Sequence, residues 1–187
     1  MTNEVFWAIA RSTGVMSLLL LTASVALGVA TRSARPLPFI PRFAVMQIHR
    51  SVSLLSLVFV LVHVGSLLFD RYSGLNLLDF FVPFMSSSDA LTNGLGTLAL
   101  DLLLALAITG ILRARISERL FHLVHWGAYA CWPLALAHGL GSGSDSGESW
   151  FLALCIGCIG VVALALVARL RSRFMDYSHK RTREVRS

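Results

Sequence analysis

Charged residues are scarce in this chain. Asp, Glu, Lys and Arg together make up 14% of its 187 residues, whereas a soluble domain usually carries about 25%. Hydrophobic residues make up 56%, and they gather in charge-poor runs of about 20 residues, the length that crosses a bilayer core. The composition therefore excludes an ordinary soluble domain and predicts an all-α protein that crosses a membrane several times.

Cysteines are few, and phosphate-binding glycine motifs are absent from the sequence. The three cysteines, Cys131, Cys155 and Cys158, all lie inside apolar runs, which excludes the disulfide framework of a small secreted domain. Cys155 and Cys158 form a C-x-x-C pair within one run, where helix packing is favoured over redox chemistry. No phosphate-binding glycine motif occurs, and no polar segment is long enough for a flavin or nicotinamide domain.

The apolar runs predict a bundle of five spanning helices. They cover roughly residues 6–30, 43–69, 91–112, 120–140 and 150–170. A cleaved signal peptide is the alternative for the first run, which is however long and lacks a basic leader. The short apolar segment 75–85 contains Pro83, so we expect it to lie along the interface or to re-enter the outer leaflet. Residues 1–170 are predicted to form one transmembrane domain, and residues 171–187 a basic cytoplasmic tail.

Basic residues are concentrated on one side of this predicted bundle. The connectors 31–42 and 113–119 and the tail 171–187 are rich in arginine, whereas the opposite loops carry mostly Asp and Glu. Because cytoplasmic loops are enriched in Lys and Arg, the N-terminus is predicted outside and the C-terminus inside. This topology accounts for the net charge of +6 without a nucleic-acid partner. We expect a multi-pass protein of the plasma (inner) membrane, surrounded by membrane lipid.

Four of the five histidines in the second and fourth predicted spans form two matched sets. His49 and His63 are 14 residues apart, which corresponds to a rise of about 21 Å and nearly four whole turns of an ideal helix. His125 and His138 lie at the corresponding depths of the fourth span, so that His49 is level with His125 and His63 with His138. Two such pairs suit two bis-imidazole haems, stacked between helices two and four.

Two details leave alternatives open. The separation of 13 positions from His125 to His138 falls about 140° short of four helical turns. We expect Pro133 to kink the helix and restore the phase. His122, one turn before His125, is the alternative inner ligand. Any single histidine could also be a core residue that is hydrogen-bonded to a neighbouring helix.

Several charged side chains near these levels are candidates for supporting roles. Asp101 is the one carboxylate expected within a span, and such a group is costly unless it is paired. We predict an ion pair between Asp101 and Arg11, with a contact between Arg11 and an outer haem propionate as the competing role. Arg50 belongs to a group of arginines expected around the inner haem, where one or two bind propionates.

The stretches QIHRSVSLLSLVFVLVH and RLFHLVHWGAYACWPLALAH resemble the ferric-reductase-like transmembrane domain. This superfamily includes ferric reductases, NADPH oxidases and the haem-binding subunit of periplasmic methionine sulfoxide reductase. The resemblance covers roughly residues 43–140 and implies that His49, His63, His125 and His138 are the axial ligands of two haems b. Many relatives have six spans and a fused flavin and nicotinamide domain, whereas five spans and no such domain are predicted here.

The sequence thus leads to the hypothesis of a di-haem b cytochrome that carries electrons to an extracytoplasmic flavoprotein, reductase or ferric chelate. It would be the electron-transfer subunit of an oxidoreductase, with a quinol or a cytoplasmic NAD(P)H dehydrogenase as donor. FMN or quinone is a further cofactor, on a partner or at the surface. We expect the partner to dock on residues 70–90 and 141–149, where Asp145 and Glu148 lie. The alternative is a non-redox membrane scaffold or a metal-binding subunit of a larger complex.

Overall fold

A computed structural model describes residues 2–32, 40–70 and 73–170, with the side chains of residues 2 and 3 left out. The regular elements in these ranges are all helices: α1 (Thr2–Arg32), α2 (Arg42–Phe69), the short 3₁₀ helix η1 (Leu77–Phe80), α3 (Ala90–Ile111), α4 (Glu118–Trp126), α5 (Ala128–Ser142) and α6 (Ser149–Leu170). The predicted tail 171–187 lies outside the described residues.

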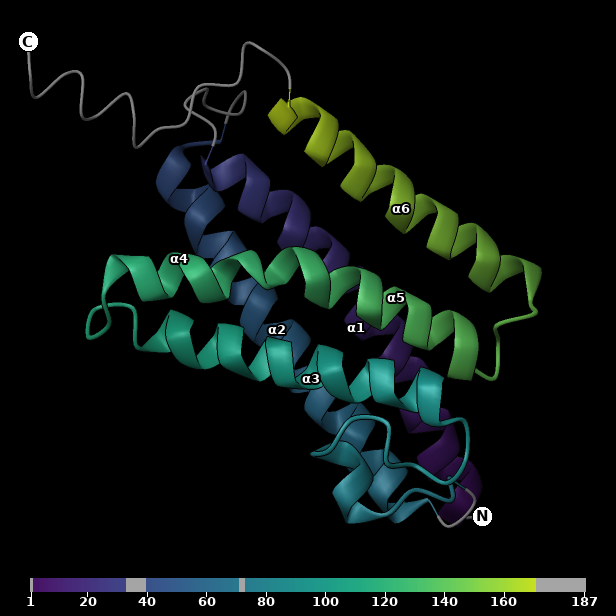
Figure 1. Cartoon of the computed structure of the whole chain (residues 1–187). Coiled ribbons are helices and arrows are strands. Elements are labelled where there is room, and N and C mark those ends of the chain that lie inside the picture. Colours follow the sequence, from purple (N-terminus) through teal and green to yellow (C-terminus); the bar gives the residue numbers. More distant parts are fainter. Residues whose placement is uncertain (1, 33–39, 71–72, 171–187) are drawn as a thin grey trace, which may run out of the picture.

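Four of the described helices are long and apolar enough to cross a membrane, namely α1 from Glu4 onward, α2, α3 and α6. The prediction of an all-helical, multi-pass membrane protein is confirmed. The fourth span, however, was expected as one helix over residues 120–140, and this is wrong. The chain forms two helices there, α4 with 9 residues and α5 with 15 residues, which run end to end beside α3 (Figure 1).

The interruption between α4 and α5 lies at Gly127 and not at Pro133. The Gly127 amide donates to the Val124 carbonyl at 2.8 Å, three residues back, and the α-helical pattern resumes where the Cys131 amide donates to the Gly127 carbonyl. A Cβ on residue 127 would lie 2.8 Å from the Val124 oxygen, so this tight turn favours glycine. Pro133 lies inside α5. A turn of the 3₁₀ type winds more tightly than an α-helix, which adds rotation between His125 and His138.

The core lies where α1, α5 and α6 meet, with α3 packed against α5. Its buried residues are Leu18, Leu21, Leu103, Cys131, Trp132, Leu136, Phe151, Cys155, Cys158 and Val162. Trp132 donates its indole N–H to Thr22 Oγ1 at 2.9 Å across this core, which satisfies the buried polar atom. Cys155 and Cys158 are free thiols within it, as expected for packing residues.

The loop between α2 and α3 folds over the beginning of α3. Asn76 and Asp79 form a reciprocal capping box around η1, and the Thr97 hydroxyl donates to the Asp79 carbonyl at 2.7 Å. A Cβ on Gly94 would collide with the Phe84 ring, so glycine lets the loop approach α3 closely. This arrangement places η1 beside the end of the bundle where α5 finishes (Figure 1).

Candidate functional site

The histidines of α2 face those of α4 and α5 in two pairs. The ring centroids of His49 and His125 are 6.4 Å apart, with their planes at 84°. Those of His63 and His138 are also 6.4 Å apart, with their planes at 77°. Following the predicted topology, we call His49 and His125 the inner pair, and His63 and His138 the outer pair.

The ring separation fits one metal ion between the two imidazoles of a pair. A metal–imidazole bond of about 2.0–2.1 Å, with the ring centroid about 1.1 Å behind the nitrogen, places the centroids of two opposed rings about 6.3 Å apart. Both pairs match this value at 6.4 Å. Each pair therefore has the spacing of two axial ligands.

Three of the four imidazoles lie against a glycine of a neighbouring helix. A Cβ would come to 3.1 Å from the His63 ring on Gly14, to 3.4 Å from the His49 ring on Gly28, and to 2.7 Å from the His138 ring on Gly96. Gly14 and Gly28 are 14 residues apart, as are His49 and His63. Our reading of the sequence missed these glycines, although their spacing repeats that of the histidines.

The outer pair is anchored through Nδ1. His63 Nδ1 lies 2.8 Å from the Ala10 carbonyl oxygen, and His138 Nδ1 lies 2.9 Å from that of Thr92. A carbonyl oxygen only accepts hydrogen bonds, so the proton of each neutral ring resides on Nδ1 and the Nε2 lone pair is free to bind a metal. These hydrogen bonds fix both the tautomer and the direction of each ring.

The inner pair lacks such anchors. The Nδ1 atoms of His49 and His125 are buried and have no hydrogen-bond partner among the described residues. The backbone of Ser24, four residues before Gly28, interacts with His49, but the criteria for a hydrogen bond are not met. Buried polar atoms without partners are uncommon and call for an explanation.

Aromatic and basic side chains surround the inner pair. Phe121 stacks on His125 with centroids 4.9 Å apart, and the Arg113 guanidinium lies 4.1 Å from the Phe121 ring. Arg32 donates to His122 Nδ1 at 3.0 Å. His125 rather than His122 thus faces His49, while His122 is exposed.

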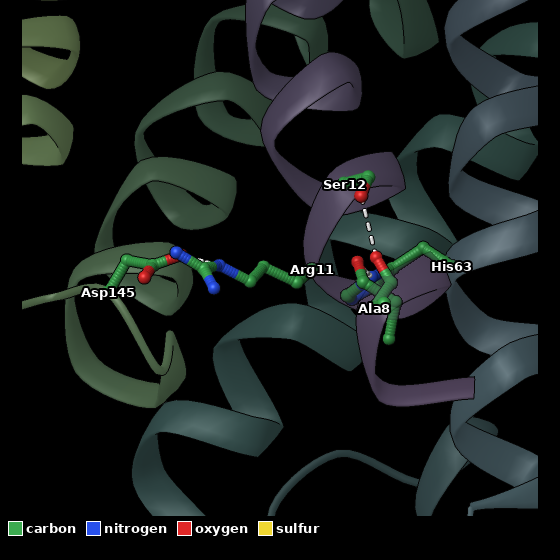
Figure 2. Close-up of polar contacts among 6 residues, drawn as sticks. Ala8, Arg11, Ser12, His63 and Asp145 are labelled. Atoms are coloured by element: carbon green, nitrogen blue, oxygen red, sulfur yellow. Dashed lines mark hydrogen bonds and ion pairs between the residues drawn. The ribbon is translucent and has the colours of Figure 1, made fainter. Parts of the chain in front are cut away.

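The two arginines named as cofactor-binding candidates differ in their surroundings. Arg50 is exposed on α2, next to His49. Arg11 forms an ion pair with Asp145, with Nε to Oδ2 at 2.5 Å, and points away from the side of α1 that His63 approaches (Figure 2). Propionate binding by Arg11 and Arg50 stays a prediction.

The expected ion pair between Asp101 and Arg11 is wrong. The loop before α6 brings Asp145 to Arg11 instead, and Asp101 is exposed on α3. Asp145 is only 6% exposed, and its role in docking stays a prediction. Glu148 is exposed and keeps that predicted role.

Among the described residues, no three His, Cys, Asp or Glu side chains gather into a group that could hold a metal ion. Each histidine pair offers two protein ligands. A metal bound between them would need further ligands from a cofactor, and a porphyrin supplies four nitrogens in one plane. The donor set, the ring spacing and the glycines against the rings therefore fit haem.

Residues 13–136 match the protein family described as ferric reductase like transmembrane component. The match covers about two thirds of the chain, includes His49, His63 and His125, and ends two residues before His138. Searches of curated proteins and of solved structures gave no match.

Proposed function

Because the chain belongs to the ferric-reductase-like transmembrane family, we propose that it is a di-haem b cytochrome of the plasma membrane. In this proposal it carries electrons across the bilayer to an extracytoplasmic acceptor, as the electron-transfer subunit of an oxidoreductase. The observation that carries the proposal is the pair of equal ring separations, 6.4 Å at each histidine pair. One such pair could arise from packing alone, whereas two pairs along α2, one with α4 and one with α5, indicate a repeated site.

The residues that would hold the cofactors are His49 with His125, and His63 with His138. Haem iron supplies reversible one-electron oxidation and reduction when it is bound. In each pair, both histidines would hold the cofactor between them. The chemistry supplied by such a group would be electron transfer.

The spacing along α2 supports a transmembrane path. His49 and His63 are separated by 14 residues, or about 21 Å along a helix, within a hydrocarbon core of about 30 Å. Each pair would thus lie near one membrane surface.

The proposed topology places the N-terminus outside and the end of α6 inside. It needs five crossings, and we assign the fourth to α4 and α5 together. Their 25 residues, 118–142, extend about 37 Å if helical throughout, enough to cross the core. Figure 1 supports this assignment, since consecutive crossings alternate in direction and α1 runs the same way as α6.

The proposed partners are those that an electron-transfer subunit of this family would need. The donor would be a quinol or a cytoplasmic NAD(P)H dehydrogenase. The acceptor would be a flavoprotein, a reductase or a ferric chelate, and FMN or quinone would be bound by the partner or at the surface. The exposed Glu148 lies on the face where we place the acceptor.

A non-redox scaffold or a metal-binding subunit is the alternative, and a haem assay separates it from the proposal. Pyridine haemochrome analysis of the purified chain should give two haems b per chain, extractable with acid acetone because no C-x-x-C-H attachment motif is present. His125→Ala should halve the haem content, and the neighbouring control His122→Ala should keep it. Absence of haem from protein produced with ample haem supply would favour the scaffold, and a value of one would reject the two-site arrangement.

A further inference from the structure

The two histidine pairs differ in their hydrogen bonds. Both Nδ1 atoms of the outer pair lie within hydrogen-bond distance of carbonyl oxygens, of Ala10 and Thr92. Both Nδ1 atoms of the inner pair are buried without a partner. Ala10 and Thr92 each lie four residues before the glycine that contacts the same ring, Gly14 or Gly96. Ser24 also lies four residues before Gly28, which contacts the His49 ring, but His49 Nδ1 has no hydrogen-bond partner in the part of the chain that the structure describes. The outer site is therefore the one in which both rings have the carbonyl anchor.

The spacing of the histidines explains why α3 does not anchor the inner pair. Gly110 follows Gly96 by 14 residues on α3, but His125 precedes His138 by only 13 on α4 and α5. Because α3 runs antiparallel to α4 and α5, the position that would repeat the Gly96 contact is residue 124. Accordingly, a Cβ on Gly110 would meet no atom within 4 Å, and His125 finds no carbonyl of α3.

We propose that the two sites are unequal, with the outer pair holding its haem more tightly and at a lower reduction potential than the inner pair. The proposal rests on the haem-binding function given above. A hydrogen bond from the far ring nitrogen to a carbonyl orients an imidazole ligand and makes it a stronger donor, which stabilises the ferric state. Loss of such a bond typically weakens metal binding about 10–100-fold.

The arginines near the inner pair, Arg32 and Arg113, would also raise the potential of a haem held there, because positive charge favours the reduced centre. A comparison of the two midpoints alone therefore cannot isolate the effect of the carbonyl anchors. Substitutions of the glycines can, since they change no charge. Alanine at Gly14 would press on His63 Nδ1 at 3.1 Å and displace the ring relative to the Ala10 carbonyl.

The test uses the full-length chain with both haems bound. Transfer of haem to excess apomyoglobin is followed by absorbance, with the phases assigned from His49→Ala and His63→Ala. We expect the outer pair to release its haem about 10–100-fold more slowly than the inner pair. Gly14→Ala should accelerate the slow phase and raise the midpoint of the outer haem in a spectroelectrochemical titration. Gly110→Ala, the control on open space, should change neither, and Gly96→Ala should repeat the effect of Gly14→Ala more strongly.

Each result decides between the claims. A chain that binds no haem would overturn the proposed function and this inference with it. Two haems that leave at equal rates, or an outer haem that leaves first, would overturn the inequality and keep the function. A slow outer phase and low outer midpoint that Gly14→Ala and Gly96→Ala both leave unchanged would assign the difference to charge and overturn the role of the carbonyl anchors.

Discussion

The guanidinium of Arg11 binds the carboxylate of Asp145 across 134 residues of sequence. Arg11 lies in the third turn of α1, and Asp145 lies in the loop that precedes α6. The Arg11 guanidinium also lies 5.1 Å from the Trp7 ring and 5.9 Å from the Trp150 ring. This contact joins α1 to the beginning of α6 at the end of the bundle that we place outside (Figure 2).

Removal of Arg11 should destabilise the bundle without loss of haem. Arg11→Met would leave the Asp145 carboxylate, which is 6% exposed, without its partner. We expect a loss of about 1.5–3 kcal/mol, measured as a lower midpoint of thermal unfolding in detergent. The double variant Arg11→Met with Asp145→Leu should lose less than the sum of the single variants. Glu148→Gln, at an exposed site in the same region, should be neutral, and an equal loss there would contradict the assignment.

The error about Arg11 shows which information the sequence does not carry. Arg11 and Asp101 occur at similar predicted depths in their helices, so depth alone suggested their pairing. Depth does not give rotation about the helix axis, and Asp101 is exposed on α3. The loop that carries Asp145 is short and polar, and no periodic pattern indicates in which direction it folds. The ion pair therefore became visible only with the tertiary structure.

The helical architecture was predictable, whereas the interruption at Gly127 was not. Long apolar runs indicate membrane-spanning helices and their number. Within a bilayer the backbone must satisfy its own hydrogen bonds, and an α-helix does so within one segment. Pro133 suggested a kink, yet a proline removes only one helical hydrogen bond and α5 continues through it. Gly127 instead adopts a tight turn in which its amide bonds to Val124, and nothing nearby in the sequence distinguishes it from other packing glycines.

The pairing of the histidines can be tested by single substitutions. His49→Ala and His125→Ala should abolish the same component of a redox titration, since these rings face each other. His63→Ala and His138→Ala should abolish the other. Loss of one common component in His49→Ala and His138→Ala would show that the register of α2 against α4 and α5 is wrong.

Trp132 should contribute more to stability than its neighbour Trp126. Trp132 is 8% exposed and donates to Thr22 Oγ1, so Trp132→Phe removes a buried hydrogen bond and leaves a gap. We expect a cost of about 1–3 kcal/mol, measured by thermal unfolding. Trp126 is 59% exposed, and Trp126→Phe should change the unfolding midpoint little. Similar effects at both positions would contradict the assigned core between α1 and α5.

Electron transfer across a membrane should require both histidine pairs in series. Each pair lies near only one surface in the proposed topology, so an electron that crosses the bilayer must visit both. In proteoliposomes with dithionite trapped inside and ferricyanide outside, the chain should support reduction of the external ferricyanide. His49→Ala and His63→Ala should each abolish this transfer, although each retains one haem.

The control His122→Ala should leave the rate unchanged, because His122 faces neither pair and contacts Arg32 instead. Leakage of reductant is measured in liposomes without protein and subtracted. Two independent sites would instead give about half the rate in each single variant. A chain in which one haem alone reaches both surfaces would lose the transfer in one variant and keep it in the other. A rate that is only halved in each variant would reject the serial path. Complete loss in both variants would support it, because each site is necessary only when the two act in series.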